Sequence, residues 1–112
     1  MIHNLNLHNS PFLRIKSGLK TIEMRCHDEE KSLIKVGDEI IFTNRDTEEK
    51  IKADVIDIKI YKDFEELYSH YNNKELGYLE EENADPNDML QYYTKDKIQK
   101  YGVMAIKIRL KK

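Results

Sequence analysis

Apolar and polar residues alternate along five segments of this chain, and an alternation with period two is typical of β-strands. These segments are residues 2–8, 21–25, 39–44, 50–60 and 103–110. The 50–60 segment, KIKADVIDIKI, alternates throughout and follows 39–44 after a short polar turn, so we expect the two to pair as a hairpin. The 103–110 segment is expected to be the closing strand.

Elsewhere apolar residues recur at spacings of three and four, which predicts short amphipathic helices. Residues whose side chains cap helix N-termini precede these segments: Ser10, Asp63, Asp85 and Thr94. Gly18 and Gly102 stand where the first and last helices are expected to end. The strands therefore come in uneven groups, which disfavours a regular parallel sheet. We expect a mixed α/β (α+β) fold, in which a small closed or nearly closed β-barrel has short helices over its openings.

Length and composition limit the classes of protein to which this chain can belong. Its 112 residues fit a single domain, 1–112, because a second core would have too little chain to bury itself. No apolar run is long enough to span a membrane and the N-terminus lacks a signal-peptide pattern, so we expect a cytoplasmic protein without membrane contact. Cys26 is the only cysteine and the four histidines show no ligand spacing, so no disulfide, metal site or cofactor is expected.

The charges are almost balanced overall but unevenly distributed. The chain has 19 basic and 21 acidic residues, a formal charge of −2, which argues against strong binding to nucleic acid regardless of sequence. Residues 63–94 contain nine acids against Lys74 alone, whereas residues 95–112 contain seven bases against Asp96 alone. Such runs are commonly solvated faces, but the acidic 63–94 segment leaves open a role as a protein-interaction module.

The stretch GLKTIEMR, residues 18–25, compresses three charged side chains into the passage from a helix to a strand. Alternation along this strand places Ile22 and Met24 toward the core, with Glu23 and Arg25 on the other face. Two interpretations remain open on physical grounds. Glu23 can bridge Lys20 and Arg25 to fasten the helix to the sheet, or the cluster can present a cation to a phosphate or, if desolvated, a base.

The motif G-x-K-T-x-E-x-R, followed about ten residues later by VGDEIIFTN and closed by YGVMAIKI, resembles an ASCH domain, a relative of the PUA domains attached to RNA-modifying enzymes. The likeness covers nearly the whole chain. It implies a PUA-like small β-barrel with peripheral short helices and a cleft that takes RNA or a nucleotide. We therefore expect RNA or modified-nucleotide binding as the function. The candidate ligand-binding residues are Lys20, Thr21, Glu23, Arg25, Asn44 and Tyr101.

The same resemblance provides an alternative function. Some small bacterial members of the superfamily are amidohydrolases that deacetylate N4-acetylcytidine with a lysine, a threonine and a glutamate. Lys20 matches that lysine, but Glu23 stands where the catalytic threonine lies, and Thr21 matches a different threonine of the motif. Glu75 is the nearest candidate for the glutamate. An enzyme of this kind would use Lys20, Glu23 and Glu75, with one carboxylate activating water and Lys20 stabilising the oxyanion.

Aromatic residues provide a further possible contact with bases. The chain has seven tyrosines, and Tyr92, Tyr93 and Tyr101 lie beside the basic C-terminal segment, where stacking and phosphate contacts would combine. We nevertheless expect Tyr68, Tyr71 and Tyr101 to pack on helix faces that close the small core.

Overall fold

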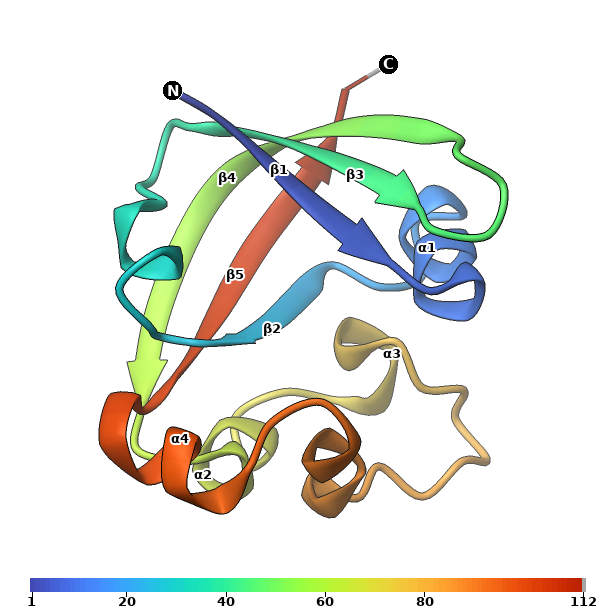
Figure 1. The fold of residues 1–112 in the computed structure, drawn as a ribbon. Coiled ribbons are helices and arrows are strands. Elements are labelled where there is room, and N and C mark those ends of the chain that lie inside the picture. Colours follow the sequence, from blue (N-terminus) through green and yellow to red (C-terminus); the bar gives the residue numbers. More distant parts are fainter. Residues whose placement is uncertain (112) are drawn as a thin grey trace.

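Five strands form one strongly curled sheet in the computed structural model, which describes residues 1–111 (Figure 1). The strands are β1 (Ile2–Leu7), β2 (Ile22–Cys26), β3 (Glu39–Asn44), β4 (Lys50–Tyr61) and β5 (Val103–Leu110). Their order across the sheet is β1-β3-β4-β5-β2, with β1 parallel to β3 and every other pair antiparallel. β1 and β2 are thus the two edges, and the sheet is a half-barrel that stays open between them. The expected mixed α/β architecture is confirmed.

The hairpin predicted from alternation is present. β3 pairs with β4 from Glu39 opposite Asp54 to Thr43 opposite Lys50. β4 then continues along β5 and shifts register between Val55 and Asp57, where a bulge lets the long strand bend. Because β4 bends here, a sheet of only five strands can curl around a core.

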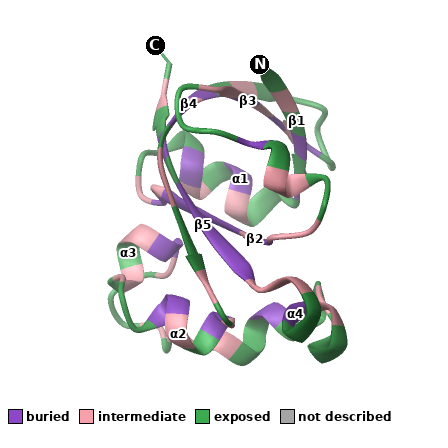
Figure 2. Cartoon of the chain, turned by 90° about the vertical axis from the view of Figure 1, so that its left-hand side faces the viewer, coloured by how far each residue is buried: buried purple, intermediate pink, exposed green. Residues whose placement is uncertain are grey.

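Short helices pack against the half-barrel, and those between β4 and β5 in the chain form a second layer that closes one end of it (Figures 1 and 2). They are α1 (Asn9–Lys16), η1 (Lys31–Leu33), α2 (Phe64–Tyr68), α3 (Asn73–Leu76), η2 (Pro86–Gln91) and α4 (Lys95–Tyr101), of which η1 and η2 are 3₁₀ helices. The predicted caps Asp63, Asp85 and Thr94 each accept a hydrogen bond from a backbone N–H of the first turn. Gly102 follows the end of α4, as expected.

The predicted cap at Ser10 is wrong. Helix α1 begins two residues earlier than expected, and His8 takes the N-cap position with an extended backbone and no side-chain cap bond. The Asp46 carboxylate, from the β3–β4 turn, accepts the Asn9 N–H at 3.1 Å instead. A cap supplied from a distant turn leaves no local signal in the sequence.

Two hydrophobic clusters lie on either side of β2 and β5. One fills the half-barrel and includes Phe12, Phe42 and Ile106, whereas the other lies between the sheet and the helical layer and includes Ile22 and Leu67. Because β2 runs between the two layers, side chains on both of its faces are covered.

Candidate functional site

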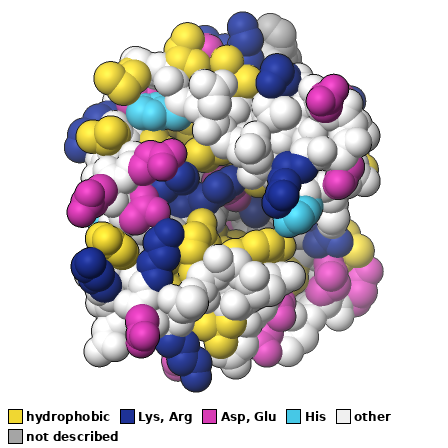
Figure 3. Space-filling model, in the orientation of Figure 1, with side chains coloured by type: hydrophobic (Ala, Val, Ile, Leu, Met, Phe, Trp, Pro, Cys, Tyr) yellow, Lys and Arg dark blue, Asp and Glu magenta, His cyan; other side chains and the backbone are white. Residues whose placement is uncertain are grey.

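A cavity of about 430 Å³ lies where the open side of the half-barrel faces the helical layer. Its wall comes from the end of β1, the start of α1, strand β2, the β3–β4 turn and the end of η2. Lys20, Glu23 and Arg25 all line it, and Arg45 adds a further cation. Figure 3 shows lysine and arginine side chains gathered in a hollow on this face of the molecule. The cavity therefore has a positively charged lining.

The Glu23 carboxylate joins the two cations of the motif. Lys20 Nζ lies 3.1 Å from Glu23 Oε1, and Arg25 donates to Oε2 from both Nε at 3.1 Å and Nη2 at 2.9 Å. Lys20 and Glu23 are 8% and 2% exposed. Alternation places Glu23 away from the core face of β2, yet it is buried, because its own face is covered from the half-barrel side: its cross-strand partner Ile106 belongs to the cluster that fills the half-barrel. The ion network and the cavity occur together, so the two interpretations of the motif are not exclusive.

Glu23 has no acceptor capacity left for another group. Its Oε1 also accepts the Met24 N–H at 3.2 Å, so four donors occupy the four lone-pair positions of the carboxylate. Burial disfavours the charge of Glu23, but the nearby Lys20 and Arg25 outweigh burial and hold its pKa below the ordinary value. The side chain is a fixed anion that orients its two partners.

Arg25 also connects the two edges of the half-barrel. Its Nη2 donates to the Asn6 carbonyl of β1 at 3.1 Å, while its other contacts hold Glu23 within β2. Burial disfavours the guanidinium charge, yet the facing Glu23 carboxylate raises the pKa of Arg25 above its ordinary value. The guanidinium therefore stays charged while partly buried in the cavity wall.

Helices α1 and α3 fix the position of Lys20 at the corner before β2. The Lys20 N–H donates to the Arg14 carbonyl at 3.0 Å, and the next residue, Thr21, donates its N–H to the Glu75 carbonyl at 3.1 Å. Gly77, at the C-terminus of α3, contacts the methylene stem of Lys20. The ammonium group is thereby directed toward Glu23 and the cavity.

Aromatic side chains form the mouth of the cavity. The His8 and Tyr92 rings face each other at 6.1 Å between centroids and 31° between planes, and Arg45 Nη1 lies 3.4 Å from His8 Nε2. Tyr92 is 50% exposed and free to meet a ligand. Tyr93 lies deeper and stacks on Phe64, and burial raises its pKa although the Arg25 charge opposes this.

Two residues of this wall, His8 and Arg45, were not predicted from the sequence. His8 and Arg45 lie on turns after β1 and β3, where nothing in their local pattern distinguishes them from other surface residues. The aromatic richness near Tyr92 and Tyr93 was the one available signal for the mouth.

Four of the predicted candidates lie outside the cavity lining. The buried Asn44 amide donates to Asn9 Oδ1 at 2.9 Å, and its oxygen accepts backbone N–H groups of the β3–β4 turn. Thr21 joins β2 to Glu75 and to β5 through its backbone, and Tyr101 lies at the end of α4 beside Lys100. The Glu75 carboxylate accepts the Asn72 N–H in a capping box. These four residues contact structural partners instead of the cavity.

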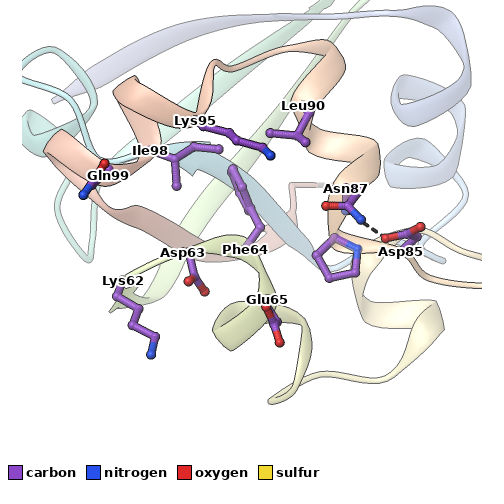
Figure 4. A pocket seen from close by; sticks show the side chains of 11 residues that line it. Lys62, Asp63, Phe64, Glu65, Asp85, Asn87, Leu90, Lys95, Ile98 and Gln99 are labelled. Carbon is purple, nitrogen blue, oxygen red and sulfur yellow. Dashed lines mark hydrogen bonds between the residues drawn. The ribbon is translucent and has the colours of Figure 1, made fainter.

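A second cavity, of about 820 Å³, lies between α2, η2 and α4 (Figure 4). Its acids have structural roles, since Asp63 caps α2 and Asp85 accepts the Asn87 N–H at 2.9 Å. The Phe64 ring belongs to the core and points toward Leu90 and Ile98. This hollow therefore lacks a buried charge directed at a ligand.

Residues 1–111, the part of the chain that the structure describes, contain neither a metal-binding cluster nor a membrane-spanning helix. Over that range no three His, Cys, Asp or Glu side chains lie together as metal ligands would. Nor does any helix there have the length and apolar character needed to cross a membrane.

Comparison with known proteins identifies relatives of this fold. The family model of the ASCH domain matches residues 5–112. The crystal structure of the hypothetical protein PH0355 superposes with a TM-score of 0.84 at 30% identity, covering 99% of this chain and 100% of that one. The solution NMR structure of protein PF0455 from Pyrococcus furiosus gives a TM-score of 0.72 at 30% identity, covering 98% and 97%.

A more distant structure shares the fold alone. A serine-to-alanine variant of ZmASCH from Zymomonas mobilis superposes with a TM-score of 0.67 at 20% identity, covering 95% of this chain and 66% of that one. The search of curated proteins found no match to this sequence.

Proposed function

The chain belongs to the ASCH domain family, a group with a PUA-like fold that is often linked to RNA binding, and we propose that its cavity binds RNA or a modified nucleotide. Lys20, Glu23 and Arg25 form the floor of the cavity. Lys20 and Arg25 donate hydrogen bonds to the ligand from this floor, and the aromatic side chains of the mouth stack on a base. A cavity of about 430 Å³ is of the size that holds small ligands in proteins.

One observation carries this proposal: two largely buried cations share a single carboxylate at the floor of a cavity. One carboxylate cannot neutralise both, so a positive charge remains where water is partly excluded. Such a charge is attractive to phosphate or to the carbonyl edge of a base, because charge-assisted hydrogen bonds are about twice as strong as neutral ones.

The amidohydrolase alternative has less support from the geometry. A general base must accept a proton at neutral pH, whereas the lowered pKa of Glu23 and its four donors make it a weak base. Glu75 is engaged in the capping box of α3, outside the cavity lining. Lys20 would have to act without a carboxylate partner that is free to activate water.

The alternative based on the acidic 63–94 segment also weakens. Several of its acids hold the segment's own structure: Asp63 and Asp85 cap helices, Asp88 accepts from the Tyr78 hydroxyl at 2.9 Å, and Glu82 pairs with Arg14 at 3.1 Å. These four acidic residues therefore have roles within the fold, and their presence does not require a basic partner protein.

The test is equilibrium binding of short single-stranded RNA at several salt concentrations. We expect affinity to fall as salt rises, because phosphate contacts release counterions. We expect Lys20→Ala to weaken binding roughly ten- to a hundredfold, the value of a hydrogen bond to a charged group. Lys16→Ala removes an exposed lysine of α1 outside the cavity lining and should leave binding unchanged.

Circular dichroism establishes that each variant is folded. Arg45→Ala, at an exposed position of the cavity mouth, supplies a second test that leaves the buried ion network intact. Absence of binding to every RNA and mononucleotide at low salt would refute the proposal.

A further inference from the structure

The charged groups at the floor of the cavity offer hydrogen-bond donors but no free acceptor. Lys20 and Arg25 are cations and can only donate, and Arg25 has five N–H groups in total. The single anion of the floor, Glu23, accepts four hydrogen bonds from its own neighbours. A ligand that reaches this floor meets donors on every charged group.

We infer that the cavity selects bases with a carbonyl oxygen at the inserted edge and discriminates against bases with an amino group there. This inference rests on the proposed nucleotide-binding function. At this edge uracil presents O4 and guanine presents O6 and N7 as acceptors, whereas cytosine presents its N4 amino donor and adenine its N6 amino donor beside N7. A donor edge would leave the buried cations unpaired and place its own N–H groups against theirs.

Groups with acceptor capacity in the lining are uncharged, and apart from the Tyr93 hydroxyl beside Arg25 they lie farther out. The side chains of Asn6 and Gln91 line the cavity but are exposed, and the Gln91 amide already donates to the Asp88 carbonyl at 2.8 Å. Asn6 and Gln91 therefore lie beside the opening of the cavity and not next to the base edge that reaches the floor. Selection by the floor therefore prevails, because its donors are charged and largely buried.

The mouth is suited to hold any base while the floor distinguishes them. Tyr92 and His8 provide aromatic faces, and stacking on such faces is tolerant of sequence. Arg45 lies beside them and suits a phosphate. Affinity at the mouth and discrimination at the floor thus come from different residues.

The experiment compares hexameric oligouridylate with hexameric oligocytidylate in the same buffer. The two RNAs have equal backbones and charges and both carry pyrimidines, and the Lys20→Gln variant separates an effect of the base edge from an effect of stacking. We expect the uridylate to bind about tenfold more tightly, within the range of discrimination that one good side-chain contact to a base edge provides. Lys20→Gln adds an amide acceptor to the floor and should reduce the ratio toward one, whereas Lys16→Gln should keep it.

Each outcome decides a different point. Equal, measurable affinities for both RNAs would overturn the inference and leave the proposed function standing, as would occur if a phosphate occupied the floor. Tighter binding of the cytidylate, or an unchanged ratio in folded Lys20→Gln, would also overturn it. Lack of binding by both RNAs at low salt would overturn the inference and the proposed function together.

Discussion

Gly77 lies against the side chain of Lys20 so closely that a β-carbon at position 77 would come within 2.8 Å of Lys20 Cδ. Gly77 has a left-handed backbone, with φ of 91°, and its carbonyl accepts a hydrogen bond from Arg14. One glycine thus ends α3 and makes room for the lysine that points into the cavity.

Replacing Gly77 with alanine should lower both stability and RNA affinity. The left-handed backbone disfavours alanine, which costs at least about 1 kcal/mol, and the added methyl displaces the Lys20 stem. Gly37→Ala is the matched control, because Gly37 is also left-handed, with φ of 94°, but has open space where its β-carbon would be. Chemical denaturation should show a loss of stability in both variants, and only Gly77→Ala should bind RNA more weakly. Equal affinity in the two variants would contradict this role of Gly77.

Replacing Glu23 with glutamine should destabilise the protein strongly. The change leaves Lys20 and Arg25 largely buried without an opposing charge, and loss of one partner from a buried ion pair costs about 3–5 kcal/mol. Glu49→Gln breaks an exposed pair with Lys16 and should cost at most about 1 kcal/mol. Urea titration measures both free energies of unfolding. A cost below that of Glu49→Gln would show that the network contributes little to stability.

Acid should loosen the attachment of β1 through Asp38. His3 Nε2 lies 2.8 Å from this carboxylate, which also accepts from the Lys35 N–H and contacts the N-terminal amine, and these interactions lower the pKa of Asp38 to about 2. A lowered pKa stabilises the folded state above the ordinary value of 3.8, and this contribution is lost as pH falls toward 2. Hydrogen exchange of the β1 amides should show the loss between these values, and Asp38→Asn should remove that pH dependence. An unchanged pH profile in the variant would exclude Asp38 as its source.

Substitution of two tyrosines tests whether RNA stacks on the aromatic side chains at the cavity mouth. Tyr92→Ala should weaken RNA binding by about 1–3 kcal/mol, the usual value of a base stacked on an aromatic side chain. Tyr101→Ala should leave the affinity unchanged, because Tyr101 lies outside the cavity lining. Fluorescence anisotropy of labelled RNA measures both. The reverse order of effects would place the ligand near α4 instead.

Local signals in the sequence were sufficient for most of the secondary structure. The hairpin of β3 and β4, the Thr94 cap and the closing strand at Val103 depend on residues that lie close together in the chain, and all were predicted. The motif at Lys20 also marked a cluster that the fold keeps together.

Long-range arrangement could not be predicted in the same way. Alternation placed Glu23 on a surface, because it shows two faces of a strand but cannot show that both are covered, the Ile22 face by the helical layer and the Glu23 face by the half-barrel. Asn44 was chosen as a ligand-binding candidate at the end of a strand, yet its amide satisfies the β3–β4 turn and Asn9. The positions of His8 and Arg45 at the cavity mouth likewise follow from how distant turns meet.

The hydrogen bond from Arg25 to the Asn6 carbonyl spans a seam that no backbone ladder crosses. A single side chain therefore fastens the sheet's two margins together and also belongs to the proposed recognition site. Mutational scans of this position will register weakened architecture and weakened recognition as one phenotype. Replacement of Arg45, which lies at the exposed mouth and holds no strand in place, would instead alter the proposed recognition alone.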